Sequence, residues 1–374
     1  MSKHKTYFIK TYGCQMNVAD SEKVAGWYES KGWKSANKIK EADEIVIVSC
    51  SVRESAENRV FGLVNNLIKL KTKNLPAGRQ GKKLKIILTG CMLRYSQRWL
   101  KEKLPDVDEF KKINEYKVQS SKNIVRQSEK HAYIPIMEGC NNFCSYCVVP
   151  YARGREVSRS FEEIVCEVEE LANRGYKEIT LLGQNVNSYG KDINNFKFEI
   201  LNFKSISKVP NFKTKYETPF AILLETLHQI PEIEKISFLT SNPWDLNEEI
   251  IEAMSLSKID RYLHLPVQSG DNEILKKMNR KYTVSDYLKL VEKIRNKIPE
   301  IKIGTDIIVG FPGETEEQFQ NTVDLCKKVG FTKAYVSIYS PREQTAAYKM
   351  KEEIPFKEKR RRWTILNQLV NNAR

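Results

Sequence analysis

The sequence predicts an α/β protein with an N-terminal open parallel α/β sheet domain followed by a (β/α)6 partial barrel. Short apolar runs, typical of buried strands, alternate with helical periodicity along most of the 374 residues. A chain of this length accommodates two domains, and a polar stretch without clear periodicity, at residues 111–130, separates two groups of strands. We therefore predict domains over residues 5–125 and 126–355, and a basic C-terminal helix over residues 356–374.

The first domain is predicted from three strands with helices between them. The strands are expected at residues 5–11, 44–49 and 84–89, and the helical patterns run over residues 21–30 and 53–71. Strands that alternate with helices in this way form a parallel sheet.

A cysteine follows each of these three strands. Cys14, Cys50 and Cys91 lie 36 and 41 residues apart, each just past a carboxyl end. Ligands of open α/β sheets bind at that edge, and neighbouring strands lie about 4.8 Å apart, so the three loops can converge. The positions predict an iron–sulfur cluster held by three thiolates, with one iron free of protein ligands.

The second domain is predicted from six further strands with helices between them, which suggests a barrel with its chemistry at the carboxyl-end loops. The strands are expected at residues 132–137, 178–182, 235–239, 261–265, 302–309 and 331–339. Cys166 and Cys326 lie inside helical patterns and are predicted to be core residues.

Three more cysteines form a loop directly after the first of these strands. Cys140, Cys144 and Cys147 have the spacing C-x3-C-x2-C. Structural zinc takes four ligands, and the nearest candidate for a fourth, His131, has no partner histidine. Three thiolates on a four-iron cluster leave one iron open for a cosubstrate. A zinc loop and three ordinary buried cysteines are the alternatives.

Composition points to a polyanionic partner. The 62 Lys and Arg residues exceed the 47 Asp and Glu residues, which gives a net charge of +15. Such an excess fits nucleic acid, although a solvated basic surface is the alternative. The sequence holds no apolar run of the roughly 20 residues that a membrane helix needs. Eight cysteines without a secretory signal favour a reducing compartment, and we expect a cytoplasmic protein.

The chain resembles the radical S-adenosylmethionine (SAM) methylthiotransferases, and within them the MiaB-type tRNA enzymes. The resemblance covers the whole chain and rests on the motifs TYGCQMN at 11–17, CSVRE at 50–54, GC at 90–91, MEGCNNFCSYC at 137–147, YARG at 151–154, LGQNVN at 182–187, LHLPVQSG at 263–270 and IVGFPGE at 308–314. The residues at 15–17 and 51–54 are similar to the branch that acts on isopentenylated adenosine.

The resemblance implies two [4Fe-4S] clusters and SAM. The thiols of Cys140, Cys144 and Cys147 would bind the radical-generating cluster, and the earlier three cysteines would bind an auxiliary cluster that presents sulfur. One SAM would methylate that sulfur, and another would yield the radical that activates carbon 2 of the adenine. The target carbon–hydrogen bond is unactivated, so no catalytic residue beyond the cluster ligands is expected.

Six polar or small residues at the barrel loops are candidate contacts for SAM or substrate. They are Gly183, Gln184, Asn185, Ser241, Gln268 and Asp306. Each could instead be a turn-forming or strand-capping residue.

The resemblance also implies partners: the anticodon stem-loop of a tRNA, and a reductant such as flavodoxin or ferredoxin. A monomer without membrane association is expected. Family members usually continue into a small RNA-binding TRAM domain, and since this sequence stops at Arg374, we expect that domain to be absent. The alternatives are a methylthiotransferase acting on ribosomal protein aspartate, and a non-catalytic, metal-stabilised RNA-binding protein.

Overall fold

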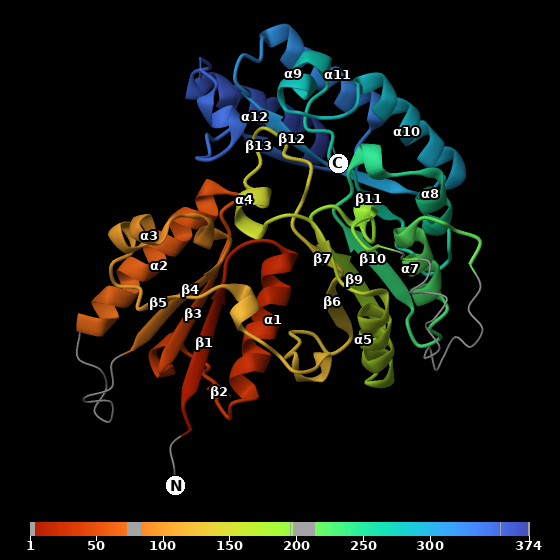
Figure 1. The fold of residues 1–374 in the computed structure, drawn as a ribbon. Helices are drawn as coiled ribbons and strands as arrows, with labels where there is room; N and C mark the ends of the chain where they lie inside the picture. Colours follow the sequence, from red (N-terminus) through yellow and green to blue (C-terminus); the bar gives the residue numbers. More distant parts are fainter. Residues whose placement is uncertain (1–3, 73–83, 195, 197–213, 352, 373–374) are drawn as a thin grey trace. The chain divides into compact units, whose positions relative to one another are not determined.

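The computed structural model describes residues 4–72, 84–194, 196, 214–351 and 353–372 (Figure 1). The chain divides into two compact units. The first comprises residues 1–135 together with 151–154, and the second comprises residues 136–150 and 155–374.

The first unit contains a five-stranded parallel sheet in the order β2-β1-β3-β4-β5. The strands of the sheet are β1 (Thr6–Thr11), β2 (Lys34–Ser35), β3 (Glu44–Ser49), β4 (Lys85–Gly90) and β5 (Glu109–Phe110). A further strand, β6 (His131–Pro135), lies at the end of the segment 1–135 and is not part of this sheet. Helices α1 (Gln15–Glu29), α2 (Glu54–Thr72) and α3 (Gln97–Lys103) connect the strands. The three long strands confirm the prediction of a parallel α/β sheet.

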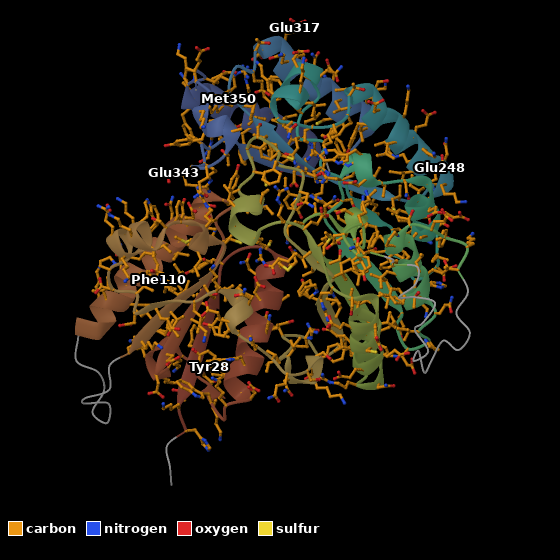
Figure 2. All side chains as sticks on the ribbon, in the orientation of Figure 1. Tyr28, Phe110, Glu248, Glu317, Glu343 and Met350 are labelled. Carbon is orange, nitrogen blue, oxygen red and sulfur yellow. The ribbon has the colours of Figure 1, made fainter. Side chains whose placement is uncertain are left out.

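The alternating side chains of β3 divide the core of this unit into two layers. Ile45 and Ile47 pack with α2 and α3, whereas Val46, one residue away, packs in a separate cluster with α1. Successive side chains of a strand point to opposite faces, so the continuous apolar run EIVIVS supplies both layers. On the α1 side, Tyr28 (Figure 2) stacks on Tyr7 with ring centroids 4.7 Å apart.

The first helix begins earlier than predicted. It starts at Gln15, directly after Cys14, rather than at residue 21. The Asn17 side chain accepts from the Cys14 amide at 3.3 Å and donates to the Ser49 carbonyl at 3.0 Å. Asn17 and Glu22 are both buried. Because these buried residues are polar, the first turns lack the apolar periodicity on which the prediction relied.

The second unit is a parallel sheet covered by helices, in keeping with the predicted partial barrel. Five of the six predicted strands lie in it, whereas the strand predicted at 132–137 corresponds to β6, which falls in the first unit. Its strands pair as β9–β10 and β11–β12–β13, all parallel. An isolated bridge between Ile236 and Ile259 links the two groups, so the strands follow one another in chain order. They are β9 (Glu178–Leu182), β10 (Lys235–Leu239), β11 (Tyr262–His264), β12 (Lys302–Val309) and β13 (Lys333–Ile338).

Helices cover the outer side of this sheet (Figure 1). They are α5 (Phe161–Asn173), α7 (Pro219–His228), α8 (Glu248–Met254), α9 (Asn272–Lys277), α10 (Val284–Lys297), α11 (Glu316–Val329) and α12 (Phe356–Asn371). A short antiparallel pair, β7 (Met137–Glu138) with β8 (Val157–Ser158), flanks the cysteine loop, and α4 (Val149–Arg153) follows that loop. No helix among the described residues is long and apolar enough to cross a membrane.

Cys326 is buried in α11, as predicted, but the prediction for Cys166 was wrong. Cys166 lies in α5 and is exposed. The buried positions Ile164, Val165 and Val168 form the apolar face of α5, and a residue one position after Val165 points away from that face, since successive helical residues are rotated by about 100°.

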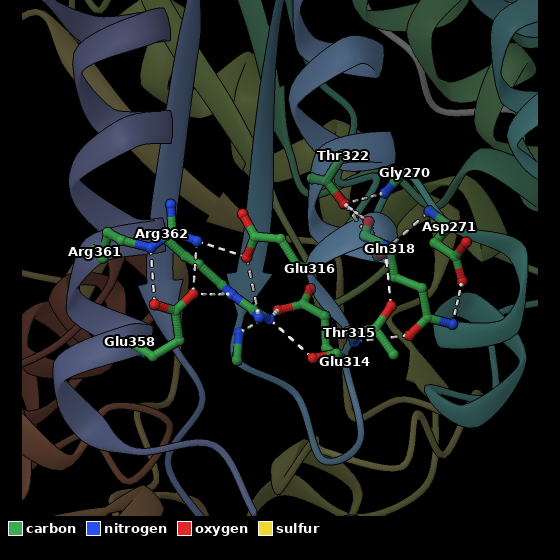
Figure 3. Close-up of polar contacts among 12 residues, drawn as sticks. Gly270, Asp271, Glu314, Thr315, Glu316, Gln318, Thr322, Glu358, Arg361 and Arg362 are labelled. Carbon is green, nitrogen blue, oxygen red and sulfur yellow. Dashed lines mark hydrogen bonds and ion pairs between the residues drawn. The ribbon is translucent and has the colours of Figure 1, made fainter.

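The C-terminal helix α12 is anchored by a buried ion pair (Figure 3). The Arg362 guanidinium lies 2.8 Å from the Glu314 carboxylate, and both side chains are at most 5% exposed. The same carboxylate accepts from the Gly310 amide at 2.7 Å, and Glu358 holds Arg362 from the preceding turn. Trp363 donates to the Val336 carbonyl of β13 at 2.9 Å. The helix is therefore part of the barrel unit.

The glycine before Cys91 provides a test of this fold. Gly90 has φ +88°, and an added Cβ would lie 2.5 Å from the Ser49 carbonyl oxygen of the neighbouring strand. We expect Gly90→Ala to lower the free energy of unfolding by roughly 2 kcal/mol or more. The matched control is Gly62→Ala in α2, where an added Cβ meets open space, and which should raise stability by roughly 0.5–1 kcal/mol. Urea unfolding measures both, and equal midpoints for Gly90→Ala and the unmodified protein would contradict this account of the β4 end.

Candidate functional site

The first three cysteines gather at one edge of the first unit. Cys50 and Cys91 directly follow β3 and β4, and Cys14 follows β1 and is the N-cap of α1. Strands β1, β3 and β4 are neighbours in the sheet, so the three loops emerge side by side. An added Cβ at Gly13 would lie 2.8 Å from the Cβ of Cys50, so the first two loops are in close contact.

The electrostatics of these thiols also indicate that they are near one another. The pKa of Cys91 is raised to about 11, chiefly by burial and also by Cys50, Asp20 and Cys14. The Arg153 guanidinium opposes this shift and is held 2.6 Å from Asp20. Burial likewise raises the pKa of Cys50. The motif YARG at 151–154 includes Arg153, but the sequence did not indicate that this residue lies near Cys91, which is more than 60 residues away along the chain.

The second cysteine set lies in the second unit, in the loop that follows β7. Burial, together with the neighbouring Cys144, raises the pKa of Cys140 to about 11 and that of Cys147 to about 12. The Cys147 amide donates to the Cys144 carbonyl at 3.0 Å. Phe143 has φ +47°, a left-handed conformation that reverses the chain between the first two cysteines.

Residues at and just after the end of α9 hold this loop in place. The Ser145 hydroxyl donates to the Lys277 carbonyl at 2.7 Å, and the Ser145 backbone amide donates to the Met278 carbonyl at 3.0 Å. The Asn279 side-chain amide donates to the Phe143 carbonyl at 3.0 Å. On the other side, the Gly139 amide donates to the Gln184 side chain at 2.6 Å. The cysteine positions are therefore set by hydrogen bonds to two separate barrel loops.

The donor chemistry of both sets fits iron–sulfur clusters. Each set offers three thiols, which favour zinc and iron–sulfur centres once deprotonated. Among the described residues, no three His, Cys, Asp or Glu side chains are grouped to hold a single metal ion. A four-iron cluster differs, because each cysteine binds a different iron and the sulfurs stand further apart. His131, the candidate fourth zinc ligand, lies in β6 with its ring against Tyr133.

Five of the predicted cosubstrate contacts lie past the carboxyl ends of β9, β10 and β11, whereas Asp306 lies inside β12. Gln184, next to Gly183, supports the cysteine loop. Asn185 is buried and donates to the Asp245 carboxylate at 2.6 Å. The Ser241 hydroxyl is buried and has no hydrogen-bond partner within the described ranges. Asp306 lies 2.9 Å from the His264 ring nitrogen. The Gln268 backbone pairs with β12 and has φ +70°.

A pocket of about 230 Å³ lies beside the cysteine loop. Its lining is polar: Asn141, Asn142, Glu156, Asn185, Ser188, Lys191, Asp192 and Asp245. One oxygen of Glu156 and the amide nitrogen of Asn142 are buried without a partner in the described part of the chain. Of these residues only Asn185 was predicted as a contact from the sequence: Asn141 and Asn142 lie in the cysteine motif but were not singled out, and the remaining residues carry no motif and meet only in the fold.

The arrangement of a parallel partial barrel with a C-x3-C-x2-C loop at its strand ends is that of radical SAM enzymes. Residues 134–326 match the family model of the radical SAM superfamily, and residues 6–111 match that of "Uncharacterized protein family UPF0004". Two solved structures share the fold. The first is a radical SAM methyltransferase, TsrM, from Kitasatospora setae, with a TM-score of 0.54 and 13% sequence identity over 90% of this chain and 75% of that one. The second is the cobalamin-dependent SAM radical enzyme OxsB, with a TM-score of 0.56 and 11% identity over 99% of this chain and 56% of that one.

Curated relatives are much closer in sequence. A tRNA-2-methylthio-N(6)-dimethylallyladenosine synthase of Thermoanaerobacter sp. (strain X514) is 44% identical, over 99% of this chain and 78% of the relative. One of Clostridium tetani is 42% identical, over 98% and 81%. The chain belongs to the radical SAM superfamily and, within it, to the family of these tRNA-2-methylthio-N(6)-dimethylallyladenosine synthases.

The pocket carboxyl Glu156 predicts a pH dependence of stability. Its pKa is raised from 4.5 to about 7, first by burial and then by Asp245. The folded protein therefore holds this proton more tightly than the unfolded chain, so stability falls as pH rises from about 4.5 to about 7. We expect Glu156→Gln to be more stable than the unmodified protein at pH 8, by on the order of 1 kcal/mol, and to lose the difference near pH 4.5. Thermal unfolding at the two pH values measures this. A variant that is less stable at pH 8 would show that the charged carboxylate is stabilising instead.

Proposed function

We propose that this protein is a methylthiotransferase that modifies carbon 2 of N6-dimethylallyladenosine, next to the anticodon of tRNA, with SAM as cosubstrate. The observation that carries the proposal is that each unit gathers three cysteines at its strand ends. A relative that is 44% identical to this chain is named tRNA-2-methylthio-N(6)-dimethylallyladenosine synthase. The family membership supplies the class of reaction, and the two cysteine sets supply the residues.

The thiolates of Cys140, Cys144 and Cys147 would hold one [4Fe-4S] cluster, and those of Cys14, Cys50 and Cys91 would hold the other. When bound, the two clusters supply an open iron that SAM can chelate, an electron for its cleavage, and a sulfur for transfer. The domain assignments follow: residues 5–125 would carry the auxiliary site, and residues 126–355 would carry the radical site.

The polar pocket of the second unit is suited to the amino-acid and ribose parts of SAM. Its carboxylates, Glu156 and Asp245 among them, can accept hydrogen bonds from an ammonium group or hydroxyls, and the Asn142 amide can donate to a carboxylate. The Ser241 hydroxyl, which has no hydrogen-bond partner among the described residues, is a further candidate contact, as are Gly183 and Gln268 near strand ends and Asp306 inside β12. These residues bind and orient, and the site needs no acid–base pair, since the bond that breaks is an unactivated C–H.

The cysteine loop also presents an aromatic ring suited to a nucleic-acid base. Phe143 is 37% exposed, and the Arg155 guanidinium lies 4.9 Å from its ring centroid. Unpaired RNA bases stack on aromatic and guanidinium planes, and the net charge of +15 favours a polyanion. We infer that this pair contacts a base of the anticodon loop.

We also propose an electron donor, an oligomeric state and a cellular location for this protein. A low-potential, one-electron donor such as flavodoxin or ferredoxin would supply the electrons, and the protein would act as a monomer in the cytoplasm. All eight cysteines are free thiols, which is the state that a reducing compartment maintains.

Iron counting after anaerobic reconstitution tests the two sites. We expect about eight irons per chain, about four after replacing Cys14, Cys50 and Cys91 by Ala, and the ability to cleave SAM retained in that variant. Replacing the other three cysteines should also leave about four irons but abolish SAM cleavage. The control is exposed Cys166→Ala, which should change neither. An unmodified protein with about four irons, unaffected by the first substitution, would exclude the auxiliary site.

The reaction itself is tested by mass spectrometry of the products. With SAM, dithionite and tRNA that carries N6-dimethylallyladenosine, the reconstituted protein should yield the 2-methylthio nucleoside. Modification of a ribosomal protein instead of tRNA would replace the proposed substrate, and zinc with no SAM cleavage would indicate a non-catalytic RNA-binding protein.

The exposed ring of Phe143 is tested by RNA binding. We expect Phe143→Ala to weaken the affinity for an anticodon stem-loop RNA by about 5- to 100-fold, since stacking contributes about 1–3 kcal/mol per base. Phe143→Tyr keeps a stacking plane and is the matched control. Fluorescence anisotropy measures the binding, and the iron content checks that the loop is intact. Unchanged affinity in an iron-replete Phe143→Ala variant would rule out the contact.

A further inference from the structure

Arg280 is a buried cation in contact with the second cysteine set. Its side chain donates to Cys144 Sγ at 3.4 Å, to the Pro266 carbonyl at 2.9 Å and to the Tyr282 hydroxyl at 3.2 Å. The guanidinium also lies over two rings, 4.6 Å from the centroid of Trp244 and 5.2 Å from that of Tyr282. The residue is 8% exposed, and five contacts from four residues fix its orientation.

The described residues give this buried cation no carboxylate partner. In the part of the chain that the structure describes, no Asp or Glu oxygen lies within 4.0 Å of its nitrogens. Other buried guanidinium groups are paired differently: Arg362 lies 2.8 Å from Glu314, and Arg126 lies 3.1 Å from Glu22. Burying a charge without a counter-ion is strongly unfavourable. The position therefore calls for a negative charge that the side chains around it do not provide.

A cluster on Cys140, Cys144 and Cys147 would supply that charge. Three thiolates carry three negative charges against two positive charges on an oxidised [4Fe-4S] core, so the assembly is anionic. Reduction takes one electron from an external one-electron donor, breaks no bond, and makes the assembly more negative. A fixed cation at one of the sulfurs stabilises the more negative state more strongly.

We propose that Arg280 is a positioning residue that acts through Cys144 as the built-in counter-ion of the radical SAM cluster and raises its reduction potential. The proposal rests on the proposed function, since it takes a cluster at these three cysteines as given. The rigid setting is part of it: the preceding residue, Asn279, has φ +57° and holds the cysteine loop through the Phe143 carbonyl. The segment that holds the cysteine loop through Asn279 therefore also places the positive charge of Arg280 beside Cys144.

The test measures the midpoint potential by redox titration with dithionite, read by electron paramagnetic resonance. The protein carries Cys14, Cys50 and Cys91 replaced by Ala, so that only the second cysteine set can bind a cluster. We expect Arg280→Gln to lower the equilibrium constant for reduction at least about tenfold, which is about 59 mV for a one-electron couple. Arg280→Lys keeps the charge and should stay within about threefold of the parent.

The matched control is Asn279→Gly, which removes the clamp on the loop, tolerates the positive φ and leaves the charge in place. It should leave the potential unchanged even if it lowers the iron content, so a loss of loop order is separated from a loss of charge. A potential for Arg280→Gln equal to that of the parent would overturn the proposal.

Loss of the cluster in Arg280→Gln would still decide the question. If the charge matters, Arg280→Lys should restore iron binding, whereas equal loss in both variants would overturn the proposal. A parent protein that binds no iron at these cysteines would instead refute the proposed function, so the two failures are distinguishable.

Discussion

The register of parallel strands is the constraint on which the rest of this structure depends. Parallel pairing brings the carboxyl ends of neighbouring strands to one edge. In the first unit, β1, β3 and β4 are adjacent, so Cys14, Cys50 and Cys91 lie at the same edge of the sheet although dozens of residues separate them along the chain. In the second unit the same rule brings Asn185, Ser241 and Gln268 to the edge of the sheet at which β9, β10 and β11 end. A shift of one strand would separate these groups.

In each unit an arginine guanidinium lies close to the buried cysteine thiols. Burial raises the pKa of Cys91, Cys140 and Cys147 well above that of a free thiol. Arg153 lowers the cost of a thiolate at Cys91, and Arg280 contacts Cys144. The two cations differ, because Arg153 is paired with Asp20, whereas no carboxylate among the described residues lies within 4.0 Å of Arg280. The positive charge of Arg280 is therefore less compensated by a neighbouring carboxylate than that of Arg153.

The sequence was sufficient where local pattern decides structure. The strands at 44–49, 178–182, 235–239 and 302–309 have the predicted bounds, because continuous apolar runs between turn residues admit little else. Buried polar residues hid the start of α1, and the exposed Cys166 could not be told from a core residue by its type. Arg280 is 136 positions from Cys144 and Glu156 is 89 from Asp245, so these contacts exist only through the tertiary fold. The assignment of the six cysteines to clusters stays a prediction.

The buried pair between Glu314 and Arg362 bears on where the barrel can be cut. Residues 126–355 look like a complete unit by pattern, yet excising them would leave the Glu314 carboxylate inside the protein with its counter-ion removed, and burial already raises the pKa of that carboxyl. Breaking such a pair typically destabilises a protein by about 3–5 kcal/mol. The smallest autonomous fragment of the barrel therefore includes α12, and a shorter expression boundary would produce a protein that folds poorly or titrates in its interior.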